Sequence, residues 1–367
     1  MATQITTPDV IIVGGGVIGL SIAQRLAGSG SRVTLIERDV AGRSASWAAG
    51  GMLSPLGEAE DAGPFLRMAL ASHQLWPEWA ASIEAQSDGD VGLHLNGKTL
   101  VAYTEDGAAR LRTRFEWQEK AGHPIHWLEA AAVREVEPAI SSEVVAGIHL
   151  PQDGRVNNRS LVSALRESCD RRGVRIREGI EVLRLTGDDQ RVTGVETSVG
   201  PVRADLTIMA AGAWAPALVG SKPLPIKGSM VELAPGGSPV KGVIAAPGAY
   251  LIPRDTPYGP RIVVGATMEE AGFDQRPSEA AIQSLQSAAI RAVPALATAE
   301  RTDAWAGLRP GSPDDLPIIG PDPRRKGLIH AHGHFRNGIL LAPLTALWVE
   351  SWILGGDPVD ARPFLPR

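Results

Sequence analysis

The sequence predicts an α/β protein of two domains, one with a Rossmann-like sheet and one with an antiparallel sheet. The chain has 367 residues, of which 44% are apolar, and this is enough to bury more than one core. Its first forty residues have the order of strand, glycine-rich turn, helix and strand that parallel sheets require. Residues 224–272 are rich in proline and glycine around alternating apolar runs, a pattern that favours antiparallel strands.

The first unit is the run DVIIVGGGVIGLSIAQRLAGSGSRVTLIERD. Residues 10–13 form a continuous apolar run typical of a buried strand, and residues 17–27 have the apolar spacing of a helix. Residues 33–36 repeat the strand pattern. Together they predict a complete strand, helix and strand unit.

The turn between the first strand and the helix has the spacing G-x-G-x-x-G. Gly14 permits a tight turn, Gly16 lets a pyrophosphate approach the backbone, and Gly19 lets helix and strand pack closely. The spacing alone is weak, because 41 glycines give about 0.5 matches by chance in this chain. Glu37 follows the loop by about twenty residues and is placed to bind ribose hydroxyls. The context predicts a dinucleotide site, and an ordinary glycine-rich turn is the alternative.

Composition excludes several classes of partner and compartment. With 36 basic and 41 acidic residues the net charge is −5, so there is no excess of positive charge to neutralise a nucleic acid. The single cysteine, Cys169, cannot form an intrachain disulfide, which fits a reducing cytoplasm. The polar start MATQITTPDV lacks the features of a signal peptide. The apolar run GILLAPLTALWVESWILGG is broken by Pro343 and Glu350, so we expect neither export nor a membrane span.

The remaining elements suggest how the domains are assembled. Helices are predicted near residues 65–85, 157–172 and 278–293, with short strands between residues 174 and 211. The run GLIHAHGHF is expected to be a strand, followed by a helix that starts near Pro343, where a missing N–H is harmless. We expect a nucleotide-binding domain from residues 1–60, 147–221 and 306–367, and a substrate-binding domain from residues 61–146 and 222–305.

Three later segments favour a flavin over a nicotinamide as the nucleotide's reactive part. In GRSASWAAGGM, Arg43, Ser44 and Ser46 provide donors, and residues 48–51 are small enough for a planar ring to lie close to the backbone. AAGAW and GHFRNGILLAP repeat this pattern of small, donor-rich loops ahead of helices. A helix starting near Pro343 would direct its positive end at the preceding loop, where it could stabilise a reduced flavin.

On these motifs the chain resembles the D-amino-acid oxidase superfamily, and within it the glycine oxidases of thiamine biosynthesis. YLIPR, VVGATM, WAGLRPG and GHFRNGILLAP carry the closer likeness. The resemblance implies non-covalent FAD, an antiparallel-sheet substrate domain and a homotetramer. Motifs and resemblance together give a candidate cofactor set of Gly14, Gly16, Val17, Ile18, Gly19, Glu37, Arg38, Arg43, Ser44, Ser46, Gly50, Gly51, Met52, Val182, Gly212, Trp214, Gly333, His334, Phe335, Arg336, Asn337, Gly338 and Ile339.

The resemblance also implies that Tyr250 and Arg309 bind a substrate carboxylate, with Met268 and Arg336 close to the substrate. The residue types suit this task, because a guanidinium grips a carboxylate with two parallel hydrogen bonds and a phenol adds a donor. Without the resemblance, Arg309 would be interpreted as a surface arginine and Tyr250 as a half-buried strand residue. The small apolar run AAPGA before Tyr250 departs from the family pattern and indicates a different substrate preference.

Two further features are interpreted as structural and not as ligand-binding sites. His330, His332 and His334 alternate and would share one strand face, but no neighbouring carboxylate or cysteine completes a ligand set, so no metal is expected. Cys169 lies in a helical stretch away from the glycine loops and is not expected to bind flavin covalently.

The expected activity is oxidation of glycine, another small amine or a D-amino acid by FAD. Molecular oxygen would be the acceptor, and the products would be hydrogen peroxide and an imine that hydrolyses to glyoxylate and ammonia. The resemblance places this in thiamine thiazole synthesis, with a thiazole synthase as partner. The alternatives are a dehydrogenase with another acceptor, a sarcosine-like or larger substrate, and a non-catalytic flavin-binding scaffold.

Overall fold

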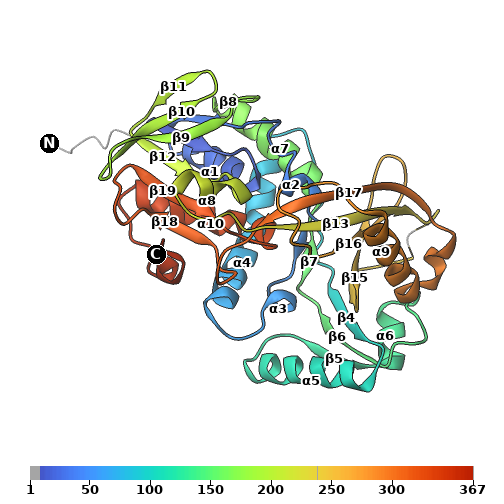
Figure 1. The fold of residues 1–367 in the computed structure, drawn as a ribbon. Helices are drawn as coiled ribbons and strands as arrows, with labels where there is room; N and C mark the ends of the chain where they lie inside the picture. Colours follow the sequence, from blue (N-terminus) through green and yellow to red (C-terminus); the bar gives the residue numbers. More distant parts are fainter. Residues whose placement is uncertain (1–8, 238, 367) are drawn as a thin grey trace.

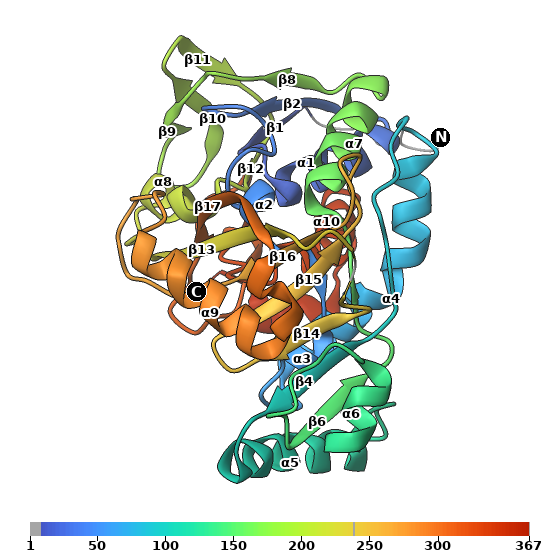
Figure 2. The ribbon, with the colours of Figure 1, turned by 90° about the vertical axis from the view of Figure 1, so that its right-hand side faces the viewer.

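The computed structural model describes residues 9–237 and 239–366, which form two large sheets joined by helices (Figures 1 and 2). In the first sheet β18 runs antiparallel to β19, and all other neighbouring strands pair in parallel. The predicted strand, glycine turn, helix and strand unit is confirmed as β1, α1 (Val17–Gly28) and β2 at its centre. The strands of this sheet, in spatial order, are β18 (Ile318–Pro321), β19 (Leu328–His332), β12 (Leu206–Met209), β1 (Asp9–Val13), β2 (Arg32–Ile36) and β8 (Arg175–Arg177).

Apolar side chains bury the first sheet on both faces. One face carries α1, α4 (Pro64–Glu84), α7 (Asn158–Arg171) and α10 (Gly338–Ile353), whose apolar stripes share one core with β1. The other face packs on a three-stranded sheet of β9 (Val182–Gly187), β10 (Val192–Thr197) and β11 (Gly200–Arg203). Burial of β1 on both faces explains why its sequence is a continuous apolar run rather than an alternating one.

The second sheet is mostly antiparallel, as the alternating sequence predicted. Only β14 and β4 pair in parallel within it. Helix α9 (Glu279–Ala292) packs on this sheet, and α5 (Glu105–Lys120) and α6 (Ala130–Val136) lie at its far end (Figure 2). In spatial order the strands are β17 (Glu300–Pro310), β13 (Pro225–Ala234), β16 (Arg261–Gly265), β15 (Ala249–Arg254), β14 (Val243–Ala246), β4 (Lys98–Ala102), β6 (Ala146–Leu150) and β5 (His126–Glu129).

Several short elements lie between or after the longer ones. Strand β3 pairs with β7 in a two-stranded sheet, and η1 with α8 follows β12. The short elements are α2 (Ala45–Ala48), β3 (Met52–Leu53), α3 (Pro55–Glu58), β7 (Gly154–Arg155), η1 (Gly212–Trp214), α8 (Ala215–Val219), η2 (Pro294–Thr298) and η3 (Val359–Phe364).

The predicted start of the last helix near Pro343 is wrong. Helix α10 begins at Gly338, and Pro343 lies inside it. The proline lacks the N–H that an interior turn requires, and the next turn opens around Ser72 of α4, whose Oγ accepts from the N–H of Leu344 at 3.4 Å. Ser72 Oγ and Trp76 Nε1 donate to the carbonyl of Leu340, at 2.7 and 3.1 Å. The helix therefore reaches five residues further back and begins inside the GHFRN segment.

The proposed division into domains remains a prediction, although the sheets follow its outline. All six strands of the first sheet lie in residues 1–60, 147–221 or 306–367. Strands β6 and β17 of the second sheet extend across the expected boundaries at residues 146 and 305. Helix α4, from the expected substrate domain, packs against α10.

No helix in residues 9–237 and 239–366 has the combination of length and apolar character that crossing a bilayer demands.

Replacing Ser72 with Ala tests how α4 supports the proline turn. The change removes one of the two donors to the Leu340 carbonyl in a fully buried place, so we expect a loss of about 1–3 kcal/mol in the free energy of unfolding, measured by denaturant titration. The control is Thr113→Ala, which removes an exposed hydroxyl bonded to a helix carbonyl and should change stability by less than about 0.5 kcal/mol. Equal effects of the two changes would contradict the account.

Candidate active site

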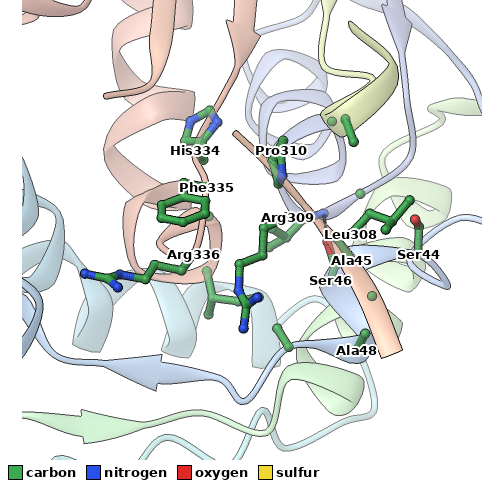
Figure 3. A pocket seen from close by; sticks show the side chains of 18 of the residues that line it. Ser44, Ala45, Ser46, Ala48, Leu308, Arg309, Pro310, His334, Phe335 and Arg336 are labelled. Carbon is green, nitrogen blue, oxygen red and sulfur yellow. Dashed lines mark hydrogen bonds between the residues drawn. The ribbon is translucent and has the colours of Figure 1, made fainter. Parts of the chain in front are cut away.

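A cavity of about 890 Å³ is lined by residues from both large sheets. One part of its wall comes from the glycine turn, the N-terminus of α1 and the end of β2. Another part comes from β13, β15 and β17, and the loop before α10 closes a third side. Figure 3 shows this junction: the side chain of Arg309 extends from β17 between Phe335 and the short helix that carries Ala45.

The glycine turn brings bare backbone to the cavity. Gly14 has φ +104°, and a Cβ there would lie 2.4 Å from the carbonyl oxygen of Ala210. A Cβ on Gly19 would lie 2.0 Å from the carbonyl oxygen of Gly14, so only glycine lets α1 pack this closely on the turn. Val17 and Ile18, the first residues of α1, are in the cavity wall. The positive end of a buried helix therefore faces the cavity, as a pyrophosphate requires.

Glu37 is held at the rim of the turn by two backbone groups. Its carboxylate accepts from the N–H of Gly15 at 2.7 Å and from the N–H of Asp39 at 3.0 Å. A carboxylate has about four acceptor positions, so two remain for hydroxyl groups. Glu37 lines the cavity at the end of β2, the position from which such an acid contacts a ribose.

The segment from Ser44 to Met52 forms another wall, and three side chains fix its path. Ser46 Oγ accepts from the N–H of Val17 at 2.9 Å, which leaves its hydroxyl hydrogen free to donate. Asn158 Nδ2 donates to the carbonyls of Ser46 and Trp47 at 2.8 Å each. Arg254 Nη2 donates to Asn158 Oδ1 at 2.7 Å and to the carbonyl of Gly50 at 3.3 Å.

Gly51 shows how closely this segment is packed. Its φ is +78°, and a Cβ there would lie 2.2 Å from the carbonyl oxygen of Val156. Burial lowers the pKa of Arg254 to about 10, which still leaves the guanidinium charged at neutral pH. The result is a rigid backbone wall without bulky side chains.

Aromatic and cationic groups border the far side of the turn. The guanidinium carbon of Arg38 lies 3.5 Å from the ring centre of Trp214, and that ring stacks on Phe273 at 5.4 Å. Arg38 and Trp214 both line the cavity. A stacked cation and ring form a flat wall suited to a planar base.

Arg309 lies on β17, and its guanidinium packs against Gly228. A Cβ on Gly228 would lie 2.4 Å from both Nη1 and Nη2 of Arg309. Nη1 donates to the carbonyl of Thr267 at 3.0 Å and weakly to that of Lys227 at 3.4 Å. Backbone carbonyls thus position the guanidinium beside the cavity, and no carboxylate in the described part of the chain forms an ion pair with it.

Tyr250 is on β15, and its ring lies against the glycine segment at Gly50. Its hydroxyl donates to Met230 Sδ at 3.3 Å, and its ring edge would lie 3.2 Å from a Cβ on Gly50. Burial raises the pKa of the Tyr250 phenol, while the charge of Arg309 acts in the opposite direction. The phenol is therefore a neutral donor at physiological pH, near the guanidinium.

Three charged residues that the sequence did not indicate, Glu58, Lys98 and Arg114, line the same cavity as Tyr250 and Arg309. Glu58 binds Arg336 at 2.7 Å from Nε to Oε2, and Lys98 Nζ lies 3.6 Å from its Oε1. Arg114 also lines the cavity, and burial lowers the pKa of its guanidinium. Behind them burial raises the pKa of Asp153 to about 7, with Lys98 opposing. Glu58, Lys98 and Arg114 come from α3, β4 and α5, so no local motif reveals them.

The structure brings nearly all predicted site residues to one cavity. Tyr250, Met268, Arg309 and Arg336 are in its wall, as is every member of the predicted cofactor set except Gly19 and Gly333. Those two act through the backbone, Gly19 at the helix contact and Gly333 with φ +74°. Asn158 and Arg254, which fix the glycine segment, were missed because they act from outside the cavity wall. The roles of all these residues remain predictions.

The histidines and Cys169 lie in different surroundings. His332 and His334 line the cavity, and His330 reaches Asp322 at 2.9 Å, so a carboxylate does lie near the row, contrary to the sequence interpretation. No group of three metal-ligating side chains occurs among the residues that the structure describes. Cys169 is buried between α7 and α1, with Sγ 3.4 Å from the carbonyl of Leu20, and burial raises its pKa to about 12.

The site fits a flavin dinucleotide. It offers a helix N-terminus for phosphates, an acid for a ribose, and a wall of small residues for a ring. The family model described as FAD dependent oxidoreductase matches residues 9–352. The chain belongs to the FAD-dependent oxidoreductase family. The predicted family and the predicted cofactor, FAD, are thus confirmed, and non-covalent attachment of FAD remains a prediction.

Individual relatives in this family are similar over nearly the whole chain. The glycine oxidase of Geobacillus kaustophilus is 36% identical over 364 residues, covering 97% of this chain and 96% of the relative. The crystal structure of glycine oxidase from that organism superposes with a TM-score of 0.93 at 34% identity, covering 98% of both chains, which confirms the predicted fold class.

The bifunctional protein ThiO/ThiG of Synechocystis is 38% identical over 356 residues, which is 95% of this chain and 52% of the relative. The chain therefore spans about half the length of the first curated relatives that it matches.

Replacing Asn158 with Ala tests the support of the glycine segment. The change removes donors to two backbone carbonyls and the acceptor of Arg254. We therefore expect the Kd for FAD to rise at least tenfold, measured by the fluorescence of the flavin released on dilution. Asn96→Ala, on the exposed surface, is the control and should change the affinity for FAD less than twofold. An unchanged affinity in Asn158→Ala would exclude the supporting role.

Proposed function

We propose that the chain is an FAD-dependent oxidase of glycine or another small amine that carries a carboxylate. The observation that supports this most directly is the placement of Arg309 and Tyr250 in the same cavity as the glycine segment 50–51. A small amino acid offers little apolar surface, so its carboxylate must supply most of the binding energy. A guanidinium held by backbone contacts and a neutral phenol are suitable donors for that carboxylate.

In this proposal the chain's residues act by orientation. A bound flavin supplies the acceptor for the two electrons and the hydrogen that leave the substrate's α-carbon. Arg309 and Tyr250 would hold the carboxylate, and Gly50, which lies against the Tyr250 ring, would leave room for the flavin ring beside them. Glu58 pairs with Arg336, whereas the guanidinium of Arg309 donates to backbone carbonyls and remains available to a substrate carboxylate.

The overall reaction balances without a further cofactor. An ammonium R–CH2–NH3⁺ and O2 give R–CH=NH2⁺ and H2O2, because the substrate loses one hydride and one proton and oxygen gains both. Hydrolysis of the imine then gives glyoxylate and ammonia when R is a carboxylate. The relatives named glycine oxidase support this substrate.

The relatives named ThiO/ThiG support a partner in the same process. They join a region similar to this chain to a second region in one polypeptide. We propose that the imine passes to a thiazole-forming partner of thiamine synthesis. The homotetramer and the cytoplasmic location expected from the sequence remain predictions of the same kind.

A larger amine is the second candidate. Ala245, Ala246 and Gly248 line the cavity next to Tyr250, and Met268 is 60% exposed at its edge. Such small and open walls leave room for a side chain or an N-substituent, as in D-alanine or sarcosine. A dehydrogenase that uses a different acceptor would share this wall.

Anaerobic addition of amines to the FAD-loaded protein tests the proposal. Glycine should bleach the flavin absorbance, and air should restore it with one hydrogen peroxide per bleaching cycle. Faster bleaching by sarcosine or D-alanine than by glycine would favour the larger amine as substrate. Bleaching that air does not reverse would favour the dehydrogenase. A flavin that no amine bleaches would contradict an amine oxidase and favour a binding scaffold.

Replacing Arg309 with Ala should raise the KM for glycine by roughly 30-fold to several thousand-fold, because removing one partner of a buried charged pair costs about 2–5 kcal/mol. Steady-state peroxide production measures this. Arg301→Ala is the control, since Arg301 lies on the same strand but pairs with Glu279 outside the cavity. Unaltered kinetics in Arg309→Ala would eliminate the assigned role.

A further inference from the structure

A row of hydrogen bonds connects the wall of the cofactor cavity to a second hollow. His332 lines the cavity, and its Nε2 lies 3.1 Å from Nδ1 of His330. His330 Nε2 lies 2.9 Å from Oδ2 of Asp322. Asp322 in turn lines a separate hollow of about 400 Å³, together with Arg325 and Trp352. The three side chains thus form a continuous path between two cavities.

The pairing of β18 and β19 explains the geometry. The two strands are antiparallel, with Gly320 opposite His330 and Ile318 opposite His332, so Asp322 follows β18 directly beside the start of β19. Alternation along β19 puts His330 and His332 on the same face, with ring centres 5.3 Å apart. All three side chains are almost fully buried, so each hydrogen bond has a fixed geometry.

The hydrogen bonds determine where the protons lie. Asp322 accepts, since burial acts to raise its pKa but hydrogen bonds from His330 and from the backbone of Arg325 and Arg324 outweigh it and lower the pKa. His330 must then carry its proton on Nε2 and accept on Nδ1, so the donor to it is Nε2–H of His332. This leaves Nδ1 of His332 as an acceptor on a residue of the cavity wall.

The surroundings keep both imidazoles neutral. The charged or titratable groups that act on the row, in the described part of the chain, are Asp322, Arg325 and His334. Burial lowers the pKa of His332 to about 3, with His330 and His334 adding to the effect, and burial lowers the pKa of His330 against the pull of Asp322. Both imidazoles are therefore neutral at physiological pH, and each carries one ring proton.

We propose that Asp322, His330 and His332 form a proton relay between the cofactor cavity and the surface hollow. The inference rests on the proposed amine oxidase function, in which a substrate ammonium must give up one proton. His332 Nδ1 takes that proton, the Nε2 proton of His332 moves to His330 Nδ1, and the Nε2 proton of His330 moves to Asp322. Asp322 then releases a proton into the hollow.

The same row returns to its first state when oxygen is reduced. A proton added at Asp322 passes to His330 Nε2, the Nδ1 proton of His330 passes to His332 Nε2, and the Nδ1 proton of His332 enters the cavity. One proton leaves and one returns in each cycle, which equals the balance of amine oxidation by O2 to imine and H2O2. Neither imidazole ring has to rotate during the cycle.

Anaerobic rapid mixing with saturating glycine tests the relay through the rate of flavin bleaching. Asp322→Asn keeps the hydrogen bond to His330 but cannot accept a proton, so we expect at least tenfold slower bleaching with an unchanged half-saturating glycine concentration. Flavin bleaching in His332→Ala should be equally slow, and added imidazole should restore the rate of bleaching. His126→Gln, on exposed β5, is the matched control. A bleaching rate in Asp322→Asn within twofold of the rate of the natural protein would overturn the relay. This result decides the question even if His332→Ala does not retain FAD.

A readout without turnover separates this inference from the proposed function. Nitrogen-15 NMR of histidine-labelled protein reports which ring nitrogens carry protons, and we expect protons on Nε2 of both His330 and His332. A proton on Nδ1 of His332 would overturn the relay. If glycine and other amines fail to bleach the natural protein, the proposed function fails while this tautomer result still decides whether the row exists as described.

Discussion

The site depends on the close approach of bare backbone to a large cavity. At Gly14, Gly19 and Gly51 there is no room for a single further carbon atom, because backbone carbonyl oxygens occupy the place where it would lie. Side chains held from behind, such as Asn158, keep these segments in position. Binding of the nucleotide and the flat ring wall both follow from this constraint. The two sheets therefore meet at a wall made largely of main chain.

The sequence was sufficient for the parts of the structure that depend on local order. The first strand, glycine turn and helix were predicted closely, since continuous apolar runs and glycine spacing determine them within forty residues. The antiparallel pairing of β15 and β16 was also predicted, because both strands alternate and lie a short turn apart. The family resemblance placed Tyr250 and Arg309, whose type alone would have suggested ordinary strand and surface residues.

Features that depend on distant contacts were missed. The start of α10 was misplaced because the compensation for Pro343 comes from Ser72 and Trp76, over 260 residues away in the sequence. Glu58, Lys98 and Arg114 meet from three separate elements, so no spacing indicates them. The carboxylate beside His330 was missed although Asp322 is only eight residues away, and recognising the β18–β19 hairpin would have found it.

We propose that one cavity holds the flavin against the glycine wall and a substrate carboxylate on Arg309. A crystal structure of the protein with FAD and glycolate, a non-oxidisable analogue of glycine in this chemistry, tests it most directly. The account predicts the dinucleotide along the glycine turn and the glycolate carboxylate within hydrogen-bond distance of Arg309 and Tyr250. A carboxylate bound elsewhere, with Arg309 still bonded only to the carbonyl of Thr267, would contradict it.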